Sequence, residues 1–427
     1  MRQMTAHDLP PLDALNRQRA PETADLVRQC LDRIAGRDGE LRAWAHVARE
    51  QALDDAEALT AELHSAGPRG PLHGIPFGVK DIYDTAGIPT CWGSEIYAGR
   101  TPAEDSALVA RLRAAGAVML GKTHTTAFAY FDPAPTRNPH NLEHTPGGSS
   151  SGSAAAVADA MVPFALGSQT MGSVLRPAAF CGIAGFKPTF GRLPHEGMLD
   201  FSATLDHPGL FTRTAADMAF LWRGLGHGNG SMGETRTFVT FEEPMDECVE
   251  EETQQALRAA EERLRGAGFA VAAVAAPDAF EGLLGATRKL MTYEGAHRHH
   301  GELERHGRRI GDKLAVLIEE GLRIPESEYH ASLAHIVAAR EEFEKFFTDG
   351  RVLLIPAAPG PAPRGLASTG NPCCNAPITA LGTPAISIPM GTARNGLPLG
   401  LQLAAGRGRD QLVLNAACLA ELTLSSS

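Results

Sequence analysis

The sequence has no apolar run long enough to cross a bilayer. The best candidates, 154–166 and 269–276, are interrupted or too short. The first eight residues show neither the basic start nor the apolar core of a secretory signal peptide. Basic residues are also too few for a nucleic-acid footprint, since 39 lysines and arginines oppose 50 acidic residues and leave a net charge of −11. We therefore expect a cytoplasmic protein that partners neither membranes nor nucleic acids.

Cysteine is scarce as well. The seven cysteines fall at no spacing typical of a metal site, and their odd number favours reduced thiols. The only gathering of histidines comprises His297, His299, His300 and His306, whose spacing matches no zinc motif. We expect these histidines on the surface, and we expect neither a metal nor another cofactor.

What is present is the pattern of a large α/β enzyme. Between residues 71 and 222, short apolar runs alternate with helical stretches and glycine-rich turns, which indicates a large, mostly parallel sheet between helices. No internal repeat or low-complexity linker interrupts the chain, so we expect one domain over 1–427. Its expected parts are N-terminal helices (1–65), a core (66–225), a variable helical region (226–370) and a return to the core (371–427).

Periodicity places the individual elements. The predicted helices cover 26–34 (with Thr23 as N-cap), 43–63, 106–115, 246–266, 279–293, 309–322 and 327–347. The predicted strands cover 75–79, 117–120, 180–186, 235–241, 269–274, 352–356 and 385–389. Among these, the strand, helix and strand between 235 and 274 form one predicted βαβ unit.

Three segments suggest chemistry. Residues 145–153 read Thr-Pro-Gly-Gly-Ser-Ser-Ser-Gly-Ser and run into an alanine-rich helix, so backbone N–H groups there can approach a charged group closely. Residues 167–177 place Ser173 among small residues, where a serine can be a nucleophile beneath backbone donors. Residues 74–81 end an apolar strand at Lys80. Loss of hydration there would lower the pKa of the lysine and let the neutral amine act as a base.

At these segments the sequence resembles the amidase-signature family. The similarity is dense over 71–214 and resumes over 375–402. It implies a large mixed sheet between helices and a serine hydrolase with three catalytic residues. By resemblance, Ser173 is the acyl-accepting nucleophile, Ser149 is the bridging serine and Lys80 is the base.

The resemblance also assigns the surroundings of these residues. It implies a cis peptide bond between Gly148 and Ser149. The oxyanion hole would be built from the backbone N–H groups of Thr170, Met171, Gly172 and Ser173. The implied substrate-binding residues are Gly148, Ser150, Gln169 and Arg176. Arg176 could bind a substrate carboxylate, or it could form a structural salt bridge beneath the site.

Finer similarity, over 135–141 and 169–177, is to the malonamidase-like branch, which hydrolyses small amides. Three positions depart from the pattern of the family. Met171 stands where many relatives have glycine, Ala127 stands where an acidic residue is common, and Gln169 replaces a familiar aspartate. These departures lie outside the three catalytic positions and could change the choice of substrate.

The predicted activity is hydrolysis of a small amide-like C–N bond through an acyl-enzyme. Neutral Lys80 would take a proton from Ser149, which would take one from Ser173 as it attacks the carbonyl. The expected substrate is a small-molecule amide, carbamate (urethane) or ester. Met291 and Tyr293, in the variable region, could line its pocket. The resemblance further suggests a homodimer.

Other interpretations need weighing. A glutaminase-type subunit of an amidotransferase, working with partner proteins, would have the same fold and catalytic residues. Residues 148–152 also match the nucleophile elbow of α/β-hydrolases, an esterase-like arrangement with Ser150 as nucleophile and Asp206 and His207 as partners. Residues 116–123 satisfy the P-loop pattern, but an apolar strand between the glycines cannot cradle phosphate, and we reject this match.

Overall fold

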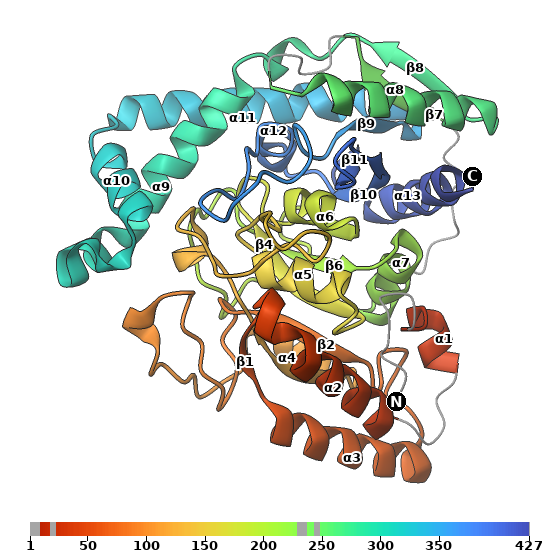
Figure 1. The fold of residues 1–427 in the computed structure, drawn as a ribbon. Coiled ribbons are helices and arrows are strands. Elements are labelled where there is room, and N and C mark those ends of the chain that lie inside the picture. Colours follow the sequence, from red (N-terminus) through yellow and green to blue (C-terminus); the bar gives the residue numbers. More distant parts are fainter. Residues whose placement is uncertain (1–8, 18–22, 229–236, 243–247, 427) are drawn as a thin grey trace.

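The computed structural model describes residues 9–17, 23–228, 237–242 and 248–426. In these ranges the chain forms a mixed α/β fold around one 11-stranded sheet (Figure 1). The strands, in spatial order, are β1 (Trp44–Val47), β3 (Val118–Thr123), β2 (Pro76–Lys80), β4 (Phe164–Gln169), β6 (His207–Thr212), β5 (Ala184–Lys187), β10 (Ala385–Thr392), β11 (Pro398–Ala404), β9 (Val352–Pro356), β7 (Thr237–Phe241) and β8 (Ala270–Val274).

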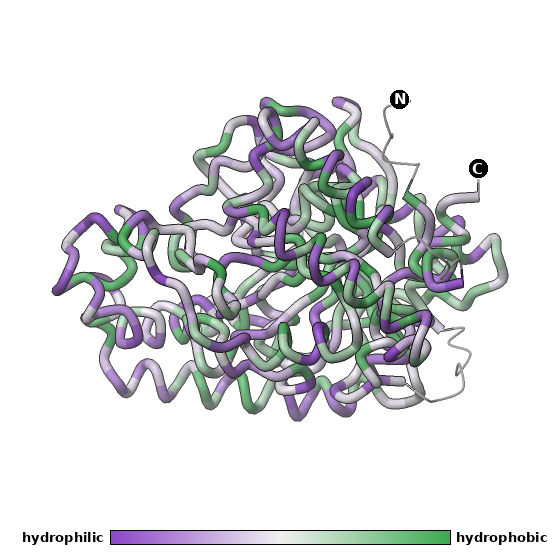
Figure 2. Tube along the Cα trace, turned by 90° about the horizontal axis from the view of Figure 1, so that it is seen from below, coloured by the Kyte–Doolittle hydropathy of each residue, from purple (hydrophilic) through white to green (hydrophobic). Residues whose placement is uncertain are grey.

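Thirteen α-helices pack around this sheet in the described residues. They are α1 (Leu12–Arg17), α2 (Thr23–Leu41), α3 (Arg49–Ala66), α4 (Ala107–Ala114), α5 (Ser151–Ala158), α6 (Leu175–Cys181), α7 (Ala215–Gly224), α8 (Glu251–Gly266), α9 (Leu283–His306), α10 (Asp312–Gly321), α11 (Glu326–Phe346), α12 (Ala376–Ala380) and α13 (Asp410–Ser425). Figure 2 shows hydrophilic and hydrophobic residues alternating along the outer helices, as expected where one face of each is buried.

The sheet separates two hydrophobic cores. In β4, Phe164 and Leu166 belong to one buried cluster, whereas Ala165 between them belongs to the other. This alternation follows from the two-residue period of a strand. Helices α2, α3 and α5 contribute to the core that contains Ala165, and α4, α7, α9 and α13 contribute to the core that contains Phe164. Both faces of the central strands are therefore buried, which explains their nearly continuous apolar runs.

The expectation of a mostly parallel sheet is wrong. Six of the ten neighbouring strand pairs are antiparallel, and four are parallel. Two features cause this. Strand β6 lies between β4 and β5 and is antiparallel to both, and β10 and β11 form an antiparallel pair joined by a short turn. The predicted βαβ unit is confirmed in the described residues, because β7 and β8 pair in parallel around α8. Residues 235, 236, 246 and 247 of the predicted elements lie outside the described residues.

Several boundaries also differ from the predictions. The helix expected over 279–293 spans Leu283–His306, and two other differences share one cause. The helix expected over 43–63 begins at Arg49, because Trp44 to Val47 pair with β3 as an edge strand. The strand expected over 180–186 begins at Ala184, because Phe180 and Cys181 end helix α6. In both cases an apolar run was shared between a strand and a helix, and periodicity over so short a run does not separate them.

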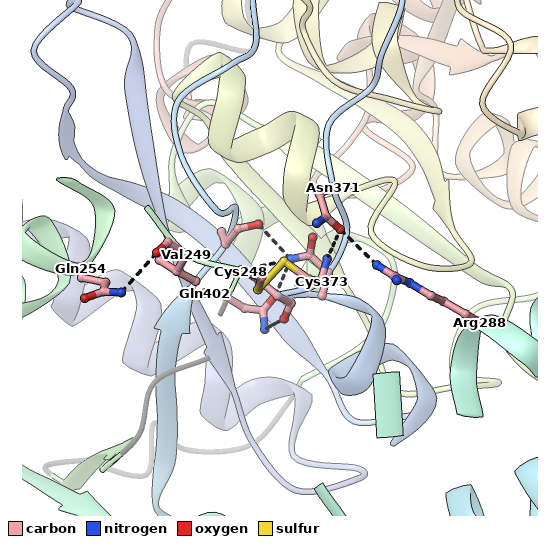
Figure 3. Close-up of a disulfide and its surroundings, with 10 residues drawn as sticks. Cys248, Val249, Gln254, Arg288, Asn371, Cys373 and Gln402 are labelled. Atoms are coloured by element: carbon pink, nitrogen blue, oxygen red, sulfur yellow. Dashed lines mark hydrogen bonds between the residues drawn. A yellow bond between two sulfur atoms is a disulfide. The ribbon is translucent and has the colours of Figure 1, made fainter. Parts of the chain in front are cut away.

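The cysteines and histidines differ from the expectation as well. Cys248 and Cys373 form a disulfide, so these two thiols are not reduced in the structure (Figure 3). His299 is buried, and its ring packs against Phe128 and Phe201. His297 is exposed on the same helix, α9, as predicted.

None of the helices in the described part of the chain combines the length and apolar character needed to span a bilayer.

Candidate active site

The site forms where two neighbouring strands end. Strands β2 and β4 are parallel and adjacent, with Val79 paired to Leu166. Because parallel neighbours end at the same edge of a sheet, the residues that follow meet there. Lys80 is the last residue of β2, and Ser168 lies one position before the end of β4.

Lys80 is fully buried and has no acidic hydrogen-bond partner among the described residues. Its Nζ donates hydrogen bonds to Ser149 Oγ at 2.6 Å and to Ser168 Oγ at 2.8 Å. Burial lowers the pKa of Lys80 to about 7, and the charge of Asp206 opposes this shift. A substantial share of the amine is therefore neutral near pH 7, as a general base requires.

Ser149 reaches Lys80 from the loop before α5. The Gly148–Ser149 peptide bond is cis, as the family resemblance implies. The carbonyl of Ser149 accepts a hydrogen bond from the Thr126 N–H at 3.2 Å. Ser151 Oγ donates to the carbonyl of Gly147 at 2.7 Å. These contacts fix the loop on both sides of Ser149.

Ser150 is fully buried and does not line the pocket. Its Oγ donates to the carbonyl of Ser168 and accepts from the Ser168 N–H, both at 3.2 Å. The α/β-hydrolase arrangement is therefore not assembled. His207 is not the partner of Ser150, because its Nδ1 hydrogen-bonds with the carbonyl of Leu205 at 2.6 Å. The Asp206 carboxylate likewise contacts other residues, because it accepts hydrogen bonds from Thr170, Phe201 and Ser202.

The segment from Gln169 to Ser173 forms a tight loop before α6. The Gln169 side chain closes it, because Oε1 accepts hydrogen bonds from the backbone N–H groups of Val174 and Leu175 at 2.9 and 3.0 Å. The amide nitrogen of Gln169 donates to Thr379 Oγ1. Gln169 therefore shapes the loop that carries Ser173 and does not line the pocket.

The backbone of this loop has free donors. Within the described residues, the N–H groups of Met171, Gly172 and Ser173 donate to no other protein group. A side chain at Gly172 would collide with Asn375 Oδ1, 2.6 Å from an ideal Cβ, and would lie 3.0 Å from Arg176 Nη1. Glycine is therefore required for the loop to pack this closely, and the free donors suit an oxyanion.

Six of the predicted residues line one narrow pocket: Ser149, Thr170, Met171, Ser173, Arg176 and Met291. The pocket is small, with a cavity volume of about 20 Å³. Its remaining lining consists of Ala129, Tyr130, Phe131, Phe201 and Thr369. Phe201 also lines a wider groove of about 690 Å³. Tyr293, which was predicted to line the pocket, lines this groove and not the pocket.

Arg176 is buried beside the pocket, with no counter-ion among the described residues. Its Nε donates to the carbonyl of Thr369 at 2.6 Å, and its Nη2 donates to the carbonyl of Gly148 at 2.7 Å. In the described part of the chain Nη1 has no hydrogen-bond partner, and burial lowers the pKa of the guanidinium to about 9. The structural salt bridge considered above is therefore absent from these residues, which leaves an uncompensated buried donor at the pocket.

The Asp206 carboxylate accepts hydrogen bonds from residues that line or adjoin the pocket. Its Oδ1 accepts from Thr170 Oγ1 at 2.5 Å, and its Oδ2 accepts from the N–H groups of Phe201 and Ser202 at 2.7 and 3.0 Å. Burial raises the pKa of Asp206, and these hydrogen bonds act in the opposite direction. The carboxyl thus connects the loop before α6 to the segment that carries Phe201.

Sequence reasoning missed several residues of the site, three of which make specific contacts there. Ser168 is the second hydrogen-bond partner of Lys80, and its place in an apolar strand gave a weak signal. Thr369 holds Arg176 from 193 residues away, and Phe201 closes the pocket. No local pattern marks either of these residues, because their role depends on contacts distant in sequence.

Known proteins are similar to this chain in both sequence and fold. The family model described as Amidase matches residues 25–227 and 237–414. The A-type subunit of the glutamyl-tRNA(Gln) amidotransferase of Lysinibacillus sphaericus (strain C3-41) is 33% identical over 436 residues, covering 89% of this chain and 88% of that protein.

Solved structures agree with the sequence matches. A crystal structure of an amidase is 30% identical, with a TM-score of 0.89, over 97% of this chain and all of that one. A 6-aminohexanoate cyclic dimer hydrolase with bound substrate is 25% identical, with a TM-score of 0.82, over 97% of this chain and 96% of that one. The chain therefore belongs to the amidase family.

Proposed function

We propose that this protein is an amidohydrolase that cleaves a small amide-like C–N bond through Ser173, Ser149 and Lys80. The hydrogen bond of 2.6 Å between Lys80 Nζ and Ser149 Oγ carries the proposal. It joins a buried amine of lowered pKa to a serine that lines the same pocket as Ser173. That combination supplies a base, a proton relay and a nucleophile.

The proposed reaction begins with proton transfer. Neutral Lys80 accepts the Ser149 hydroxyl proton, and Ser149 accepts the proton of Ser173 as its Oγ bonds to the substrate carbonyl carbon. The oxygen of the tetrahedral intermediate is stabilised by the free N–H groups of the loop before α6. The C–N bond then breaks, and the departing nitrogen takes a proton returned from the Lys80 ammonium through Ser149.

Water completes the cycle. A water molecule attacks the acyl-enzyme ester while the same relay removes its proton, and the C–O bond to Ser173 breaks. The serine regains its proton, and the acyl part leaves as a carboxylic acid. Carbamates and esters present a similar carbonyl, so the proposed substrates include them.

Two features of the pocket favour a small substrate with a carboxylate. Arg176 offers an unpaired buried donor, and an anionic group would supply the charge that no described residue provides. Met171, Phe201 and Met291 narrow the pocket, which leaves little room for a bulky acyl group. These features support the malonamidase-like branch as the proposed placement within the family.

Active-site labelling tests the proposal. The purified chain is treated with a fluorophosphonate, and the adduct is located by peptide mass spectrometry. We expect a single adduct on Ser173 that is lost in Lys80→Ala, because the relay then lacks its base. An adduct on Ser150, or undiminished labelling of Lys80→Ala at about pH 7, would refute the mechanism. Thermal melting of the variant controls for loss of fold.

A second candidate is a glutaminase-type subunit of an amidotransferase. The amidotransferase relative named above is consistent with this candidate, since that similarity extends over most of both chains. The two functions predict different partners. A free hydrolase releases ammonia from several small amides without other proteins. Activity on glutamine alone, together with co-purification of further subunits, would favour the amidotransferase.

A further inference from the structure

Three cysteines from two distant segments meet away from the catalytic pocket. Cys248 precedes α8, whereas Cys373 and Cys374 precede α12. Their three Sγ atoms all lie within 4.8 Å of one another, the one group of three possible metal ligands among the described residues. Cys248 and Cys373 form the disulfide in Figure 3, and Cys374 is the third, unbonded sulfur, 4.0 Å from that of Cys373.

The surroundings hold these sulfurs in place. Cys373 and Cys374 are almost completely buried, together with Val249 and beside Leu284, whereas Cys248 is partly exposed. In Figure 3, the Cys373 N–H donates to Asn371 Oδ1, at 3.1 Å, which fixes the turn. An ion could therefore enter from the Cys248 side without unfolding the segment that carries the other two sulfurs.

The spacing suits a thiophilic metal. Two sulfurs bound to one tetrahedral Zn²⁺ at about 2.3 Å lie about 3.8 Å apart. The 4.0 Å between Cys373 and Cys374 is close to this value. We propose that the reduced protein binds one thiophilic closed-shell metal ion, with Zn²⁺ as its representative, through Cys248, Cys373 and Cys374, and that the disulfide excludes it.

Zinc binding requires that the Cys248–Cys373 disulfide is first reduced, for example by a dithiol. Reduction gives the disulfide two electrons and two protons, which yields two thiols while the reductant becomes a disulfide. Binding of Zn²⁺ then displaces three protons from the three thiols. The complex carries one net negative charge. A water molecule would complete the tetrahedron on the exposed side.

Zinc titration tests the site without any measurement of activity. The full chain is stripped of metal and prepared in two forms, reduced with a phosphine or oxidised with oxidised glutathione, and the forms are verified by counting free thiols. Zn²⁺ is then titrated against a chromophoric chelator. We expect one equivalent per reduced chain and at least a tenfold weaker affinity in the oxidised form. Cd²⁺ should add thiolate charge-transfer absorption to the reduced form only.

Matched variants identify the ligands. Cys248→Ser alters the partly exposed member and should weaken zinc binding at least tenfold, whereas Cys418→Ser, at a free cysteine of α13 outside the cluster, should leave it unchanged. Melting curves confirm that both variants fold. Equal zinc binding by the reduced and oxidised forms, or by Cys248→Ser and the unaltered chain, would overturn the proposal, as would a reduced chain that binds no zinc.

Discussion

The Lys80 amine is buried without an acid to hold its proton in the described residues, and this single residue sets the expected pH dependence. Its Nζ donates hydrogen bonds to the hydroxyls of Ser149 and Ser168. Burial lowers its pKa to about 7, so it is charged and inactive as a base below that pH. We expect kcat/KM to rise with pH as one proton is lost, with an inflection near pH 7.

The measurement is a pH profile of kcat/KM with a substrate that does not titrate. Asp206→Asn provides the comparison. Because the charge of Asp206 raises the pKa of Lys80, its removal should move the inflection to lower pH. A profile that stays flat through about pH 7 would contradict the assignment of Lys80 as the base, and an unmoved inflection in Asp206→Asn would contradict the electrostatic coupling.

Arg176 determines a second prediction, on substrate choice. Its unpaired Nη1 should bind a substrate carboxylate, and a hydrogen bond between charged groups contributes about 1.5–3 kcal/mol. Arg176→Ala should therefore lower kcat/KM for malonamate about 10- to 100-fold more than for the neutral diamide. Because Arg176 also holds the carbonyls of Gly148 and Thr369, both substrates will lose some activity. An equal loss for the two would refute a carboxylate-binding role.

At the scale of elements, helix α9 forms part of the pocket. Its Met291 lines the pocket, and its Gly295 packs against the Phe201 ring, which stacks on Tyr130 at a centroid distance of 5.3 Å. An ideal Cβ at Gly295 would lie 2.6 Å from Phe201 Cε1. The helix thus requires glycine here in order to hold Phe201 against the pocket.

Gly295→Ala should therefore displace the Phe201 ring. We expect a lower stability, by about 1–3 kcal/mol, and a changed KM, because the ring borders the pocket. Gly301→Ala, on the same helix, is the control, since its Cβ would meet only Arg305 at 3.8 Å. Denaturant unfolding and steady-state kinetics check both variants. Identical behaviour of the two would show that α9 does not position Phe201.

Strand β2 and the loop at Ser149 could be predicted because their signals are local, whereas strand β4 was not predicted. Lys80 follows an apolar run, and the loop at Ser149 is marked by consecutive glycines and serines. Strand β6 was not predicted. Its sequence begins His207-Pro208-Gly209, which resembles a turn, and it becomes a strand because β4 and β5 pair with it on both sides. Such tertiary context is absent from local patterns.

One continuous sheet runs through the whole described molecule, and the C-terminal helix α13 packs against α7 and β10. Strands from all four predicted segments contribute to this sheet. We propose that they unfold as one unit. Helix α13 docks on α7 through Glu421, whose Oε2 accepts a hydrogen bond from the Ala215 N–H at 2.8 Å. Burial raises the pKa of Glu421 to about 7, above its usual value of 4.5.

This raised pKa has a consequence for stability. Between about pH 4.5 and 7 the folded chain binds more protons at Glu421 than the unfolded chain, so this contribution to stability is lost as pH rises through that window. Glu421→Gln keeps an acceptor for Ala215 and should stabilise the protein at about pH 8 by about 1–3 kcal/mol, with little gain at about pH 4.5. Melting curves of both proteins at the two pH values check the Glu421 prediction, and an equal change in stability at both pH values would contradict it. A single melting transition is expected if the strands unfold as one unit.

The position of the chemistry along the chain bears on how the family diversifies. Lys80 ends β2, Ser149 lies in the loop before α5, and Ser173 lies in the loop after β4, whereas Met291 reaches the pocket from a helix more than 100 residues later. Substitutions or recombination in that later region can therefore alter the choice of substrate without disturbing the proposed proton relay. Members of one family can in this way keep the same proposed catalytic residues and accept different substrates. A new substrate specificity can then arise without an inactive intermediate protein.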